Sequence, residues 1–167
     1  MKVNDVLIES FGRLPDLVES AVDGLSPEQL RTPPAEGANP VGWLVWHLTR
    51  VQDSHVAELL GEDQLYATGD WAASFGLDPD PEDHGYGHTA EQVATVRPRD
   101  GKALIDYYRA VHERTIAYLG TLTESDLDRV VDDNWDPPVT LGVRLASVLD
   151  DDTQHVGQAA YVRGLLL

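Results

Sequence analysis

The chain has 167 residues, the usual size of one domain, and 42% of them are hydrophobic, enough to bury a core without disulfides. Its formal net charge of −17 would repel phosphate backbones and anionic lipid surfaces, so nucleic acid and membranes are not expected partners. The first residues reach the acidic side chain of Asp5 before any apolar block forms, unlike a secretory signal, and we therefore expect a single cytoplasmic domain over residues 1–167.

Helical spacing of apolar residues predicts a first long helix over residues 3–24, which Pro15 should kink or interrupt. Ser26-Pro27-Glu28-Gln29 has the form of a capping box with proline at the first helical position, which predicts a short helical turn. Asn39-Pro40 repeats this arrangement at the start of a second long helix, and Gly61 should end that helix.

Residues 61–99 are rich in Gly, Pro and acidic side chains, and only Thr89-Ala90-Glu91-Gln92 indicates a brief capped helix. This length suits a crossover that lets the second and third helices run parallel, although a partly disordered loop would also fit. The third helix is expected over residues 101–121, and Thr123 should cap a short acidic turn after it. Thr140 should cap a fourth helix that runs almost to the C-terminus. The predicted fold is an all-α four-helix bundle with a long crossover between helices two and three.

Two polar residues interrupt the apolar face of the predicted fourth helix. Asp151 and His155 share a face with Val148, Ala159 and Val162, and their spacing of four puts both side chains one turn apart. This is how two protein ligands grip one metal ion, but the same spacing is also common in surface ion pairs.

His47 is the second such case, because its neighbours in the second helix are apolar, and a histidine in that setting needs a partner. A hydrogen-bonded core histidine is one reading. The other combines His47 with Asp151 and His155 as three ligands from facing helices, with a position left open for water or substrate. We expect the latter, a catalytic type of metal site. Zinc is the default ion, and nickel, iron and manganese suit the same ligands.

Several neighbouring residues could share in this site. Asp152 is a rival ligand, since it lies three residues before His155, but we prefer Asp151 and expect Asp150 and Asp152 to be solvated. For His55 and His112 we favour a hydrogen-bonded packing role over lining a pocket. His84 and His88 lie in the crossover, where they could form a lid but are expected on the surface.

The motifs that carry these residues resemble a known family, the DinB-like superfamily, over nearly the whole chain. The motifs are Gly42-Trp43-Leu44-Val45-Trp46-His47-Leu48, Asp151-Asp152-Thr153-Gln154-His155-Val156-Gly157-Gln158 and Tyr161-Val162-Arg163-Gly164. Within the family the chain is most similar to the mycothiol-dependent branch that includes maleylpyruvate isomerase. The resemblance implies the same helix order, a metal held by His47, Asp151 and His155, and a homodimer. That branch has glutamate where this chain has Asp151, which is one methylene shorter.

The resemblance also implies an activity. Because the chain has no cysteine, sulfur would come from a low-molecular-weight thiol such as mycothiol, activated by the metal to attack a small electrophile in a transfer or isomerisation. Arg163 matches an arginine of the family's closing motif and is a candidate for binding an anionic group, and Trp46 is a candidate wall of the pocket. Two alternatives stay open: a small metal-dependent hydrolase that activates water, and a non-catalytic bundle that binds a ligand.

Overall fold

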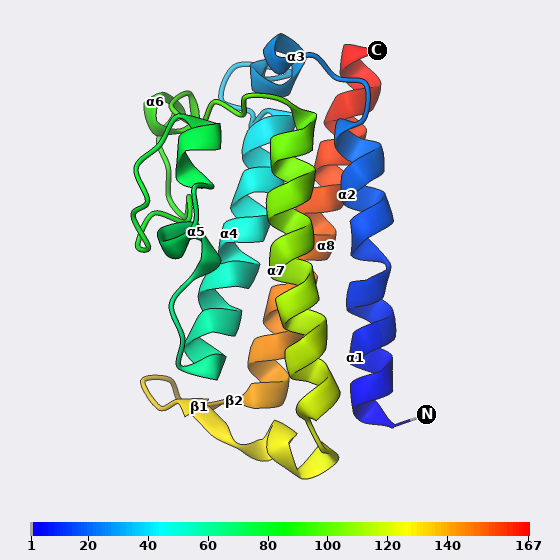
Figure 1. Cartoon of the computed structure of the whole chain (residues 1–167), viewed down its shortest axis with the longest axis vertical. Coiled ribbons are helices and arrows are strands. Elements are labelled where there is room, and N and C mark those ends of the chain that lie inside the picture. The colour runs from blue at the N-terminus through cyan, green and yellow to red at the C-terminus, as the bar shows by residue number, and fades with distance from the viewer. Residues whose placement is uncertain (1) are drawn as a thin grey trace.

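The computed structural model describes residues 2–167, and its long helices form the predicted four-helix bundle. The first bundle helix is a pair of segments, α1 (Val3–Gly12) and α2 (Leu14–Val22), and the other three are α4 (Val41–Leu60), α7 (Gly101–Thr121) and α8 (Leu141–Leu166). Figure 1 shows that α4 and α7 run parallel to each other, while α1, α2 and α8 run in the opposite direction. The long crossover between helices two and three makes this parallel arrangement possible, as predicted.

Short elements connect the bundle helices. They are α3 (Pro27–Arg31), α5 (Leu65–Thr68), the 3₁₀ helix η1 (Ala72–Phe75), α6 (Ala90–Val93), the 3₁₀ helix η2 (Glu124–Asp128) and the strands β1 (Val130–Asp132) and β2 (Val139–Thr140). The strands pair antiparallel in a small hairpin that the sequence did not predict. Strands of this length are too short to show a period of two.

Local sequence signals explain most helix boundaries. The break between α1 and α2 puts Pro15 in the first turn of α2, where its missing N–H breaks no helical hydrogen bond. Ser26 and Thr140 accept hydrogen bonds from backbone N–H groups as the predicted caps of α3 and α8. The start of α4 differs from the prediction: Pro40 is the N-cap, and no side chain caps this helix.

The core lies along the axis of the bundle and joins all four bundle helices. Apart from Arg50, its largest fully buried side chains are aromatic or aliphatic, and each of these contributes roughly 1.5–3 kcal/mol by leaving water. Within residues 2–167, no helix combines the length and apolar character that a membrane span requires. The crossover folds on itself through backbone hydrogen bonds such as Arg97 N to Phe75 O at 2.8 Å, and it is held on α4 by contacts such as the hydrogen bond from Tyr66 N to Asp53 Oδ2 at 2.9 Å. This packing brings the crossover over α4.

Candidate metal centre

The structure brings the three predicted ligands together. His47 comes from α4, and Asp151 and His155 come from α8, and one potential ligand atom of each lies within 4.8 Å of the others. The two imidazole rings meet edge to face, with 4.8 Å between their centroids. His155 Nε2 lies 3.5 Å from Asp151 Oδ1. Two such atoms bound to one zinc at tetrahedral angles would be roughly 3.4 Å apart, so the spacing fits a shared ion.

The other nitrogen of each histidine is occupied by a hydrogen bond. His47 Nδ1 lies 2.5 Å from the backbone oxygen of His84, and His155 Nδ1 lies 2.8 Å from Oε1 of Gln158. Because both oxygens can only accept, each Nδ1 carries a proton, and Nε2 is the nitrogen of each ring that remains available to a metal. Ligand histidines in metal sites use this arrangement, in which an outer partner fixes the tautomer and the orientation of the ring.

The two histidines titrate differently because their surroundings differ. His47 is 5% exposed, and burial lowers its pKa, so the neutral ring that a metal requires is favoured. The contact with the Asp151 carboxylate raises the pKa of His155. Oδ2 of Asp151 is buried without a hydrogen-bond partner, which leaves this carboxylate free to bind a cation.

An aromatic side chain supports the site, but it is Trp43 and not the predicted Trp46. The indole of Trp43 stacks on His47 with 4.6 Å between ring centroids and 12° between planes. Trp46 is buried beneath the crossover, stacked on His88 at 5.9 Å, and does not line the cleft beside the three ligands. Its proposed contact with a cosubstrate therefore finds no support in its position.

Arg163 also lies away from the cleft. Its guanidinium donates a hydrogen bond to the backbone oxygen of Asp23, which ties the end of α8 to the turn after α2. It is absent from the residues that line the cleft beside the ligands. A structural role at the helix end accounts for this contact.

A cleft of about 320 Å³ opens beside His47 and Asp151, and its other lining residues are Val51, Ser54, His55, His84 and Tyr86. His55 Nδ1 accepts a hydrogen bond of 2.9 Å from Arg144 Nη1, since a guanidinium can only donate. The neutral ring of His55 therefore carries its proton on Nε2. Burial and the Arg144 charge lower the pKa of His55, which favours this neutral form.

The prediction for Asp152 was wrong. We expected it to be solvated, but it is fully buried, and neither carboxylate oxygen has a hydrogen-bond partner. The buried stripe of α8 includes Val148, Asp152, Val156 and Ala159, so Asp151 and His155 lie at the edge of the core face, turned toward α4. Burial, with the nearby Asp151 charge, raises the pKa of Asp152 well above its usual value. Asp150 is exposed, as predicted.

The crossover histidines also differ from expectation. The His88 side chain is 9% exposed, accepts a hydrogen bond from Trp43 Nε1 at 3.2 Å, and contacts Asp83 Oδ1 through Nε2 at 2.8 Å. Its predicted surface position is therefore wrong. His84 is half-buried, and its backbone oxygen rather than its ring supports the site. His112 stacks on Tyr108, 5.9 Å between centroids, in a packing role, although its Nδ1 has no hydrogen-bond partner.

Two groups near the site were missed at the sequence level: the buried pair Arg50 and Asp53 on α4, and Gly85 in the crossover. The charged pair had a visible signal, because it interrupts an apolar-rich helix as Asp151 does. Gly85 had none, since the crossover contains many glycines.

Comparisons with known proteins agree with this architecture. The family model of the DinB superfamily matches residues 10–159. A crystal structure of a conserved protein from Enterococcus faecalis is 36% identical, with a TM-score of 0.91, covering 99% of this chain and 98% of that one. YfiT from Bacillus subtilis, described as a probable metal-dependent hydrolase with an unusual four-helix bundle topology, is 20% identical, with a TM-score of 0.65, covering 95% of this chain and 85% of that one. No curated protein matches the sequence significantly.

Proposed function

This chain belongs to the DinB superfamily, and on that basis we propose that it is a metal-dependent enzyme in which His47, Asp151 and His155 hold one divalent cation beside the cleft. The observation that carries the proposal is the state of the two histidines. Each has its Nδ1 engaged by an oxygen acceptor, which leaves Nε2 as the ligand atom, and one ligand atom of each lies within 4.8 Å of an Asp151 carboxylate oxygen. Ligand histidines in metal sites have this matched arrangement almost without exception.

Three protein ligands leave a position open on a divalent ion, and the cleft gives small molecules access to it. A divalent cation supplies Lewis acidity there, which lowers the pKa of a nearby water or thiol toward neutrality. The residues of the chain orient the ligand atoms and line the cleft. The hydrogen bonds at Nδ1 orient the rings of His47 and His155, burial favours the neutral ring of His47, and His55, with its proton on Nε2, is a hydrogen-bond donor at the cleft wall.

We propose a low-molecular-weight thiol such as mycothiol as the nucleophile. The chain has no cysteine, so a thiol must come from outside, and its three motifs resemble those of the mycothiol-dependent branch. In a transfer reaction the thiol would lose its proton, sulfur would bond to an electrophilic carbon, and the leaving group would depart with the bonding electrons. Zinc is the default ion for this ligand set, and the family resemblance favours a homodimer.

Hydrolysis is the second candidate. The description of YfiT, a bundle of related fold, as a probable metal-dependent hydrolase favours it, because hydrolysis uses water as the nucleophile. The same three ligands serve either nucleophile. The two candidates differ in one measurable property: only the transferase requires an added thiol for turnover.

The experiment that tests the site is elemental analysis by plasma mass spectrometry of tag-free wild-type protein, His155→Ala and Asp150→Ala. Asp150 is exposed on the same helix and serves as the control. We expect about one equivalent of metal in the wild type and the control, and little in His155→Ala. Wild-type protein that stays metal-free after incubation with zinc, nickel and manganese would overturn the proposal and favour a ligand-binding bundle. Turnover screened with and without thiol then separates transferase from hydrolase.

A further inference from the structure

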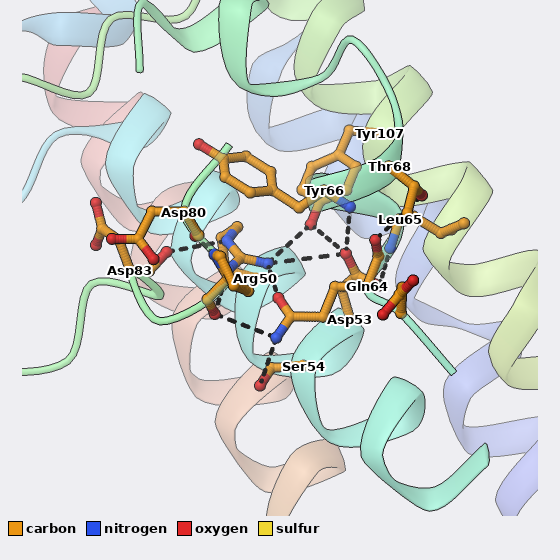
Figure 2. Close-up of polar contacts among 12 residues, drawn as sticks. Arg50, Asp53, Ser54, Gln64, Leu65, Tyr66, Thr68, Asp80, Asp83 and Tyr107 are labelled. Atoms are coloured by element: carbon orange, nitrogen blue, oxygen red, sulfur yellow. Dashed lines mark hydrogen bonds and ion pairs between the residues drawn. The ribbon is translucent and has the colours of Figure 1, made fainter. Parts of the chain in front are cut away.

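A buried ion pair on α4 holds part of the crossover in place. Arg50 and Asp53 are both fully buried, 3.8 Å apart between Nη1 and Oδ2. Figure 2 shows the Arg50 guanidinium between the Asp80 to Asp83 stretch on one side and Tyr66, Tyr107 and Asp53 on the other. A buried pair of this kind adds little net stability compared with apolar residues of similar size, so its contacts are the better guide to its role.

All three nitrogens of Arg50 donate hydrogen bonds. Nε donates to the backbone oxygen of Asp83 at 3.0 Å, and Nη2 donates to those of Pro81 and Asp80 at 3.0 and 3.3 Å. Nη1 donates to Gln64 Oε1 at 2.7 Å, and the guanidinium lies over the ring of Tyr66, 4.0 Å from its centroid. The planar fork of arginine suits such a set of carbonyls, whereas a lysine ammonium cannot span them.

Asp53 holds the first part of the crossover. Its carboxylate accepts hydrogen bonds from the backbone N–H groups of Leu65 and Tyr66 at 3.0 and 2.9 Å, and from the hydroxyl of Tyr107 at 2.8 Å. The charge of Asp53 keeps Arg50 neutralised in the interior. The pair therefore binds two parts of the crossover to one turn of α4.

The segment held by Arg50 leads directly to the candidate metal centre. We call residues 80–85 the strap. Arg50 binds three of its carbonyls, and the next one, that of His84, accepts the hydrogen bond from His47 Nδ1. His47 precedes Arg50 by three residues, so both lie on the same side of α4.

Gly85 ends the strap and lies close against α4. Its φ of +91° is in the region that favours glycine. A Cβ at this position would lie 2.9 Å from His47 Nδ1 and 2.9 Å from Trp46 Cζ3, closer than atoms can pack. Only glycine therefore lets the strap lie against the imidazole.

We propose that Arg50 and Gly85 are positioning residues for the metal ligand His47: Arg50 fixes the strap, Gly85 seats it, and the carbonyl of His84 then holds His47 with Nε2 unprotonated and directed to the ion. The proposal rests on the proposed function only in taking His47 Nε2 as a metal ligand. Neither residue contacts the ion. A merely structural role would secure the crossover without setting the tautomer of His47.

The sharpest test compares Gly85→Ala with Gly87→Ala. Both glycines have positive φ, so both substitutions strain the backbone, but a Cβ on Gly87 meets no atom within 4 Å. Long-range proton–nitrogen NMR of the metal-free protein reports the tautomer of His47. We expect the Nδ1-protonated form in the wild type and Gly87→Ala, and its loss in Gly85→Ala. Zinc affinity, measured by competition with a chromogenic chelator, should fall roughly 10- to 100-fold only in Gly85→Ala.

A second pair of variants tests Arg50 with its charge retained. Arg50→Lys keeps a cation beside Asp53 but cannot bind the three strap carbonyls together. Arg114→Lys is the control, because Arg114 also lies near Asp53, at 3.7 Å, and binds the crossover at the Asp63 carbonyl, outside the strap. We expect a mixed His47 tautomer and zinc binding at least tenfold weaker in Arg50→Lys, and no change in Arg114→Lys.

The possible results distinguish a failure of this positioning proposal from a failure of the proposed metal-dependent function. Folding of each variant is checked by circular dichroism and thermal unfolding. Folded Gly85→Ala protein that keeps the Nδ1-protonated His47 would overturn the proposal. The comparison of Gly85→Ala with Gly87→Ala tests the proposal even if Arg50→Lys fails to fold. If the wild type binds no zinc, the proposed function fails, and the NMR comparison of the metal-free proteins still tests the positioning of His47.

Discussion

His155 donates a hydrogen bond from Nδ1 to Oε1 of Gln158, which lies almost one turn further along α8, at 2.8 Å. The acceptor is part of the same helix as the ligand, so this tautomer is set by local sequence. His47 depends instead on a carbonyl from the crossover, 37 residues away in the chain. The two candidate ligands are therefore oriented by different kinds of contact.

Removing the local acceptor should weaken metal binding. Gln158→Met keeps the size of the side chain but leaves His155 Nδ1 without its partner, and we expect zinc affinity to fall about tenfold or more in chelator competition. Gln154→Met is the matched control, because Gln154 is also exposed on α8 and binds Asp150 instead. Equal affinities for the two variants would show that Gln158 does not support the site.

The choice between adjacent aspartates can be tested directly. Asp151→Asn removes the charged oxygen ligand next to His155 Nε2, and we expect metal to be lost from the purified protein. Asp150→Asn should keep the metal content of the wild type, since Asp150 is exposed and outside the cluster. Full metal content in Asp151→Asn, measured by plasma mass spectrometry, would contradict the proposed ligand set.

Asp152 should destabilise the folded protein. It is fully buried without a hydrogen-bond partner, and an unpaired polar group in a core costs about 1–3 kcal/mol. Asp152→Leu should therefore raise the thermal unfolding midpoint, at about 2–4 °C for each kcal/mol in a chain of this size. Asp150→Leu, at an exposed position, should change it little. A lower midpoint in Asp152→Leu would mean that the carboxyl group has a stabilising partner.

His112 should make stability depend on pH. Burial lowers the pKa of its imidazole below the usual 6.5, so the unfolded chain takes up a proton at a higher pH than the folded one. The contribution of the neutral His112 ring to folding stability is present above pH 6.5, and it is lost as the pH falls through 6.5 toward the pKa of His112 in the folded protein. His112→Phe keeps a ring against Tyr108 but removes the titration. We expect the thermal unfolding midpoint of this variant to fall less than that of the wild type between pH 7.5 and 5.5. Equal falls in the two midpoints would refute the prediction.

The sequence by itself determined the long helices and several of the short ones. Caps at Ser26 and Thr140, the proline in α2 and the glycine after α4 are local signals, and the helices they predicted are present. The spacing of Asp151 and His155 needed only the period of a helix. Apolar stripes on four long helices were enough to predict the bundle, because burying such stripes is the main stabilisation available to them.

Only the tertiary structure decided how these elements face one another. Whether Asp151 or Asp152 enters the core depends on the rotation of α8, which packing against α2 and α4 sets, and an apolar stripe more than 100° wide leaves that rotation undetermined. The contact between His47 and the strap depends on a carbonyl 37 residues away and on the Arg50 fork that holds it. Contacts of this kind form only when the whole chain has folded, so no local pattern could predict them.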